Sequence, residues 1–307
     1  MTPPADDVPV RPGGPSAREL DPPTPDRVSV AVGAVVVTLA AHNIVSHRAV
    51  HRDLHLPINL ALGGLLVALG RSAGLSASEM GLDPARVPDG TRHGVLAAGA
   101  VIAVAAAGAA WPRTRHLYVD EAVAAASPRR AAYEAALRIP LGTATFEEVA
   151  FRGVLDPLLA RRLPGTAAAL ASSALFGLWH VVPTLDRAPD RPTTAPRSRA
   201  VVLAGHVALT AVAGLGFRWL HERSGSLLAP VLAHAATNVA GYLAARLVRA
   251  GSGTRDRAER APAGAVSQPA GRSGPRRGVA HGAQADGDPG RLHVELLRLL
   301  APLAGNR

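Results

Sequence analysis

The chain has 307 residues, of which 48% are hydrophobic and only 18% are charged, whereas an average soluble domain carries about 25% charged residues. It contains no cysteine, which excludes disulfides and thiolate sites, and the basic side of its net charge of +10 is entirely arginine. These arginines are scattered through loops and tails, which argues against nucleic-acid binding and favours orientation in, and contact with, a lipid bilayer.

Residues 1–27 are rich in Pro, Asp and Arg, which predicts a disordered tail without a cleavable signal. Apolar segments near the length of a membrane span, about 20 residues, follow in chain order. We place them at about 28–46, 56–74, 93–111, 133–160, 164–182, 199–220 and 226–248. The pattern predicts an all-α polytopic membrane bundle with about seven transmembrane helices, within a range of six to eight, in a cell membrane.

The predicted membrane domain therefore covers residues 28–249. Residues 250–290 are dominated by Gly, Ser, Pro, Arg and Asp, which predicts a disordered linker. Residues 291–307 contain a short amphipathic pattern, which is compatible with an interfacial helix or with a tail of no particular role.

The fourth apolar segment differs from the others because it contains three charged residues, Glu147, Glu148 and Arg152, within a stretch of six residues. Charged side chains at the centre of a bilayer cost roughly 2.5–3.5 kcal/mol each on insertion scales, so they should face the protein interior and pair. Glu148 and Arg152 are four residues apart on one helical face and can form an ion pair. Glu147 is offset by about 100°, so we expect it to stay largely unpaired and to be available as a general base. An ordinary charge cluster at a helix end is the alternative.

Two further segments carry polar residues. His180 ends the fifth segment in the run Phe176-Gly177-Leu178-Trp179-His180, and by itself could be an interfacial residue. His234 and Asn238 share one face in the middle of the last segment, and by themselves could simply tie helices together. In combination, the residues of all three segments form a set that could activate water. A carboxylate and one imidazole would take the proton, and a second imidazole with a carboxamide would donate hydrogen bonds to an oxyanion.

This combination resembles the CAAX-protease and bacteriocin-processing family, which includes the CAAX prenyl endopeptidases. The motifs that carry the resemblance are EEVAFR at 147–152, FGLWH at 176–180 and HAATN at 234–238, and it covers about residues 130–245. The resemblance implies an all-helical membrane fold with a central catalytic chamber. It also implies that Glu147 works as the base with His180, that His234 and Asn238 form an oxyanion hole, and that Glu148, Arg152 and Phe176 support them.

The resemblance leaves the metal question open, because the family has been described as a metalloprotease group and Glu147, His180 and His234 are plausible zinc ligands. We favour a metal-free hydrolase, since the chain has no HExxH motif and the Asn238 carboxamide is a poor zinc ligand. The predicted function is therefore an intramembrane endopeptidase of the bacterial inner membrane, acting on a membrane-associated or lipidated peptide or protein. A non-catalytic membrane scaffold or a bacteriocin self-immunity protein is the alternative.

Overall fold

The computed structural model describes residues 25–187 and 196–260, and all regular structure in these two ranges is helical. In chain order the elements are α1 (Pro25–Ala49), η1 (Arg52–Leu54), α2 (His55–Ser72), η2 (Pro84–Arg86), α3 (Val87–Ala110), η3 (Arg115–Tyr118), α4 (Glu121–Ala125), α5 (Pro128–Tyr133), η4 (Glu134–Ala144), α6 (Thr145–Glu148), η5 (Val149–Leu155), α7 (Asp156–Ala160), α8 (Gly165–Trp179), α9 (Val181–Arg187), α10 (Pro196–Ser224) and α11 (Leu228–Arg260).

Six helical segments of the described chain are long and apolar enough to cross a membrane, so this is a multi-pass membrane protein with an all-α fold, as predicted. They correspond to six of the seven predicted segments. The six ranges are 27–49, 52–72, 84–110, 165–186, 200–224 and 228–249. The predicted fourth segment, 133–160, is helical throughout but is not one of the six. Its Glu and Arg side chains, which the sequence already showed, lower its hydropathy below that of the others.

That fourth segment runs through the bundle as an unbroken helical stretch, α5–η4–α6–η5–α7. Its first residues meet η1, directly before α2, through an ion pair between Arg130 and Asp53. At its other end, Arg161 donates to the carbonyl oxygens of Ala73 and Gly74, just after the end of α2. The segment therefore spans the length of α2 although its composition is not that of an ordinary membrane span.

Much of this segment is wound as π-helix, in η4 and η5, with one α-helical turn between them that carries Glu147 and Glu148. Pro140 interrupts the α-helical pattern because it lacks a backbone N–H. Both the backbone N–H and the hydroxyl of Thr145 donate to the Pro140 carbonyl oxygen. Single π-turns are rare and often mark functional sites, and here they flank the two glutamates.

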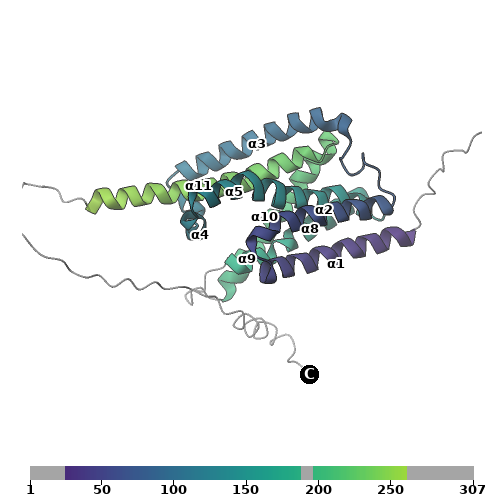
Figure 1. Ribbon diagram of the computed structural model, residues 1–307, viewed down its shortest axis with the longest axis horizontal. Helices are drawn as coiled ribbons and strands as arrows, with labels where there is room; N and C mark the ends of the chain where they lie inside the picture. The colour runs from purple at the N-terminus through teal and green to yellow at the C-terminus, as the bar shows by residue number, and fades with distance from the viewer. Residues whose placement is uncertain (1–24, 188–195, 261–307) are drawn as a thin grey trace, which may run out of the picture. The chain divides into compact units, whose positions relative to one another are not determined.

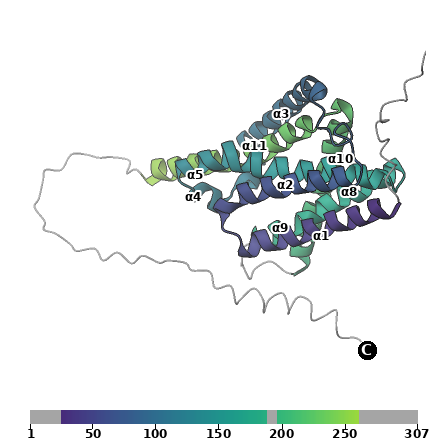
Figure 2. The ribbon, with the colours of Figure 1, turned by 45° about the vertical axis from the view of Figure 1, so that its right-hand side comes forward.

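Helices α1, α2, α8, α10 and α11 pack against the fourth segment, and α3 packs on α11. Figures 1 and 2 both show α3 lying along α11 on one side, with α1 on the opposite side next to α2 and α8. Close packing of α8 on α10 depends on Gly177, because a Cβ there would lie 2.6 Å from the Val207 carbonyl oxygen. The turn before α11 is closed by a hydrogen bond from the Leu227 N–H to the Gly81 carbonyl, 2.9 Å, at a glycine with a φ of +68°.

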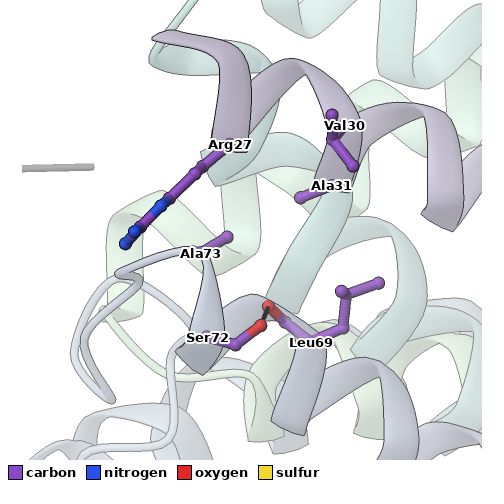
Figure 3. A pocket seen from close by; sticks show the side chains of 6 residues that line it. All are labelled: Arg27, Val30, Ala31, Leu69, Ser72 and Ala73. Carbon is purple, nitrogen blue, oxygen red and sulfur yellow. Dashed lines mark hydrogen bonds between the residues drawn. The ribbon is translucent and has the colours of Figure 1, made fainter. Parts of the chain in front are cut away.

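An apolar groove of about 310 Å³ lies between the beginning of α1 and the end of α2 (Figure 3). It is lined by Arg27, Val30, Ala31, Leu69, Ser72 and Ala73. None of these residues is one of the predicted site residues.

The predicted tails are mostly outside the described residues: residues 1–24 of the N-terminal tail, 261–290 of the linker and 291–307 at the C-terminus. Helix α11 continues to Arg260, so the first residues of the predicted linker extend the last membrane helix.

Candidate active site

The predicted residues Glu147, His180 and His234 meet in the interior of the bundle. Glu147 comes from the α-turn between the two π-helical stretches, His180 follows the end of α8, and His234 lies in the second turn of α11. The Glu147 Oε2 atom is 3.9 Å from His180 Nε2 and 3.7 Å from His234 Nε2. Glu147 is 6% exposed, and this oxygen is buried without a hydrogen-bond partner among the described residues.

The other ring nitrogen of each histidine fixes how the imidazole is protonated. His180 Nδ1 is 2.8 Å from the Phe176 carbonyl oxygen, which can only accept, so Nδ1 carries a proton and donates it. His234 Nδ1 lies 2.7 Å from Glu148 Oε1, and that carboxylate is paired with Arg152, so Nδ1 is again the donor. In the neutral form of each ring, Nε2 then presents a lone pair. With both rings neutral, the three facing atoms, Glu147 Oε2 and the two histidine Nε2 atoms, are therefore all hydrogen-bond acceptors.

Glu148 is fully buried and joins two parts of the site. Its Oε1 accepts from Arg152 Nη1 at 3.1 Å, which is the ion pair that the four-residue spacing predicts, and from His234 at the same time. Arg152 in turn donates through Nη2 to the Gly214 carbonyl oxygen at 3.0 Å. The link from Glu148 to His234 was missed by the sequence analysis, because no local pattern relates residues 86 positions apart.

Aromatic rings hold these groups in place. The Arg152 guanidinium lies over the Phe176 ring, 4.1 Å from its centroid, and the His180 ring meets Phe176 edge-on at 4.8 Å. Phe176, the predicted supporting residue, therefore contacts both. Phe217 stacks on His234 with ring centroids 4.8 Å apart and an interplanar angle of 15°. Phe217 was not expected at the site, since a phenylalanine in an apolar segment carries no signal of its own.

Asn238 lies one turn after His234 on α11 and is half-buried. No hydrogen bond joins its side chain to another residue of the described chain. The spacing places it on the same helical face as His234, so its carboxamide is left with both donors and its acceptor available.

The charges of the site continue away from Glu147 as a buried series. Asp156 is close to Arg152 and 3.4 Å from Arg218 Nη1, and Arg218 also contacts the exposed Glu222 at 2.8 Å. Apart from the exposed Glu222, the series contains three carboxyl groups and two guanidinium groups. With all five groups ionised, it has one negative charge more than positive charges. One additional proton or a bound cation would balance it.

The residues expected for a zinc site, Glu147, His180 and His234, have donor atoms that suit such an ion. Among the residues that the structure describes, no group of three or more His, Asp or Glu side chains is arranged as a metal site. The facing atoms are also compatible with a water molecule, whose two protons would meet two of the three acceptors.

Comparison with known proteins relates one part of the chain to a family. Residues 131–240 match the family described as Rce1-like, Type II CAAX prenyl endopeptidase. No curated protein and no solved structure shows significant similarity to the chain. The matched segment contains all three motifs, from Glu147 to Asn238. Over residues 131–240, the membrane core of this chain is thus similar to the CAAX prenyl endopeptidases.

Proposed function

We propose that this protein is an intramembrane endopeptidase in which Glu147 activates a water molecule for attack on a peptide bond. The observation that carries this proposal is the buried, unpartnered Oε2 of Glu147, which both histidine Nε2 atoms face at 3.7 and 3.9 Å. Such spacing is too long for direct hydrogen bonds, and a water molecule between Glu147 and His180 would supply the donors that these two acceptors lack.

In this mechanism the water donates one proton toward Glu147, while His180 accepts its second hydrogen bond and orients it. The water oxygen forms a bond with the carbonyl carbon of the substrate, and the carbonyl oxygen becomes an oxyanion. Glu147 then passes the proton to the amide nitrogen, the carbon–nitrogen bond breaks, and a carboxylic acid and an amine leave. General base catalysis of this kind contributes about 10²–10⁴-fold to a rate.

His234 and Asn238 would stabilise the oxyanion by donating hydrogen bonds. For His234 this requires a proton on Nε2, and its Nδ1–H already donates to Glu148, so the ring would act as an imidazolium. Removing one donor of an oxyanion hole costs about 10²–10³-fold in rate in other hydrolases.

We propose that the reaction is metal-free. The Asn238 carboxamide suits hydrogen-bond donation better than zinc binding, which favours an oxyanion hole on this face of α11. Should the enzyme use zinc, Glu147, His180 and His234 would hold it and the ion would supply an activated water. Stoichiometric zinc in the purified protein, together with activity that a chelator abolishes and zinc restores, would overturn the metal-free assignment.

The substrate that we propose is a membrane-associated or lipidated peptide or protein of a bacterial inner membrane. The site lies between membrane-spanning helices, so a substrate has to approach through or along the bilayer. The matched family is that of the CAAX prenyl endopeptidases, and we extend only its general reaction, peptide-bond hydrolysis, to this chain.

The test compares wild type with Glu147→Gln and Glu147→Ala in detergent, against a library of internally quenched membrane peptides. Glu79→Gln, which removes a carboxylate in the loop after α2 and away from the site, is the matched control. We expect cleavage to fall by at least about 10²-fold in both Glu147 variants, with melting temperatures near the wild-type value, and to persist in Glu79→Gln. Equal cleavage, or none by any form, would favour the non-catalytic scaffold or immunity protein.

A further inference from the structure

The groove between the beginning of α1 and the end of α2 lies at the edge of two apolar spans. The span on α1 begins at Arg27, and the span that contains α2 ends at Ser72. Both of these residues line the groove, so it lies where the hydrocarbon core of a bilayer meets the lipid headgroups. Its volume of about 310 Å³ is at the lower end of the range for small-molecule sites, roughly 300–1,000 Å³.

Small side chains leave this groove open on its buried side. Ala31 and Ala73 line it from the two helices, and each is 3% exposed. Figure 3 shows their methyl groups directed toward each other. Val30, which also lines the groove, is 70% exposed and therefore lies at its rim, whereas Leu69 is half-buried. A groove with alanines at the bottom and a rim that faces the bilayer suits a flexible hydrocarbon chain.

The polar end of the groove carries a positive charge. Arg27 is exposed, and its side chain extends away from Val30 and Leu69 (Figure 3). No carboxylate among the residues that the structure describes forms an ion pair with this guanidinium. The apolar part of the groove and an arginine at its end together match a molecule that has a hydrocarbon chain and an anionic group.

Two further arginines lie at the same end of the bundle. Arg161 donates to the carbonyl oxygen of Ala73, at 3.2 Å, and its charge is matched by Glu79. Arg162 donates to the Ser29 hydroxyl on the first turns of α1, at 2.6 Å, and is exposed. The region around the groove therefore has more positive than negative charge among the described residues, which favours an anionic headgroup over a zwitterionic one.

We propose that this groove binds an anionic phospholipid, with one acyl chain along Ala31 and Ala73 and the phosphate at the Arg27 guanidinium. An acyl chain gains little by leaving the surrounding lipid, which is as apolar as the groove, so the headgroup charge decides which lipid stays bound. A guanidinium can bind two phosphate oxygens at once. The groove lies outside residues 131–240, and this site does not depend on the proposed peptidase function.

Native mass spectrometry of the full chain in detergent measures the headgroup preference. We expect wild type to bind phosphatidylglycerol at least about 5-fold more tightly than phosphatidylethanolamine with the same acyl chains, the worth of one arginine near a headgroup. Arg27→Gln should reduce the affinity for phosphatidylglycerol to about that for phosphatidylethanolamine. Arg113→Gln, which removes an arginine in the loop after α3, is the control of equal charge and should keep the preference. Glycerol 3-phosphate, which lacks acyl chains, should not displace the lipid.

Photo-crosslinking in lipid vesicles locates the acyl chain. We expect phosphatidylglycerol with a diazirine on its acyl chain to crosslink chiefly within residues 27–31 and 69–73. Val30→Trp should reduce these crosslinks by placing an indole ring at the rim. Val104→Trp on α3 is the matched control, because Val104 is 72% exposed and Val30 is 70% exposed, so neither change disturbs the core.

Each contrary result would overturn the site. Equal affinity of wild type for the two lipids, or equal losses in Arg27→Gln and Arg113→Gln, would mean that only the overall positive charge attracts lipid. Displacement by glycerol 3-phosphate would mean that the arginine binds free phosphate. Crosslinks outside the two ranges, or crosslinks that Val30→Trp leaves unchanged, would mean that the groove has another occupant, such as the residues before α1. None of these measurements involves cleavage, so their outcome is separate from that of the peptidase test.

Discussion

At the scale of single residues, one carboxylate oxygen, Glu148 Oε1, contacts two other residues of the site. Glu148 Oε1 accepts from Arg152 and from His234, so it orients the imidazole that we propose for the oxyanion hole and anchors the guanidinium beneath it. Glu147, one position earlier, makes neither contact. Two adjacent glutamates of identical chemistry thus have different surroundings, and the difference comes from the direction in which each leaves the same helical turn.

This contrast predicts opposite effects for the two glutamates. Glu148→Ala should lower the free energy of unfolding by about 3–5 kcal/mol, because it removes the ion-pair partner of the buried Arg152 guanidinium. Glu147→Ala, with no ion pair of that kind to break, should have a much smaller effect on stability while abolishing cleavage. Thermal unfolding in detergent measures both, and a Glu148→Ala variant as stable as wild type would contradict the assigned role.

At the scale of elements, α8 packs closely on α10 beside the site. Gly177→Ala should destabilise the protein by about 1–3 kcal/mol, the usual cost of overpacking, because the new methyl group would collide with the Val207 carbonyl oxygen. Gly216→Ala is the matched control, since that position on α10 has open space around it. Melting temperatures of the two variants should differ clearly, and equal values would show that the helices can separate at little cost.

The loop after α2 is held by a small network that responds to pH. Ser76 and Glu79 bond to each other's backbone N–H groups, and Arg161 pairs with Glu79 at 2.8 Å. Partial burial acts to raise the pKa of Glu79, but the hydrogen bonds from Ser76 and Arg161 outweigh it and hold the pKa below its ordinary value of about 4.5. A depressed pKa means that the stabilisation is present above pH 4.5 and is lost as the pH falls through the folded-state value.

Glu79→Gln should therefore be slightly less stable than wild type at pH 7, by less than about 1 kcal/mol because the pair is partly exposed. The difference should shrink as the pH is lowered below the ordinary carboxyl value. Urea or thermal unfolding over pH 3–7 measures this. A stability difference that stays constant over that range would mean that the carboxylate charge is not what holds the loop.

Most of the helices could be predicted from the sequence, because they depend on the composition and spacing of residues that are close together in the chain. Apolar length was enough for six spans, and a four-residue spacing was enough for the Glu148–Arg152 pair, which is present. The π-helical winding around Pro140 was not predicted, because it depends on backbone contacts that no side-chain period reports. The contacts of His234 with Glu148 and of Asn43 with Trp179 join residues far apart in sequence, and they follow from packing rather than from any pattern.

At the scale of the whole molecule, contacts at the helix ends divide the described chain into two sides. The loop after α2, Arg161 and the start of α11 meet at one end, through Arg161 with Gly74 and Leu227 with Gly81. At the other end, Arg130 pairs with Asp53, and Arg246 donates to the carbonyl oxygens of Val123 and Ala126. The fourth segment joins these ends, so we predict seven membrane crossings although only six segments qualify by hydropathy.

Single cysteines in the cysteine-free chain test this topology. With seven crossings, Cys at Ser78 and at Leu163 should react with an impermeant thiol reagent from the same side of a sealed vesicle, and Cys at Arg113 from the opposite side. If the fourth segment did not cross, Leu163 would instead share its side with Arg113. Labelling before and after permeabilisation distinguishes the two patterns without any assumption about activity.

The charged fourth segment also has a consequence for how the protein enters the membrane during synthesis. Its Glu148, Arg152 and Asp156 are matched in part by His234, Gly214 and Arg218, all of which are translated after it. Until those partners exist, each charge at the bilayer centre costs roughly 2.5–3.5 kcal/mol. We therefore expect the nascent segment to stay near the lipid headgroups or within the translocation machinery until α10 and α11 have been synthesised. The helices of the bundle would then not insert into the bilayer strictly one at a time.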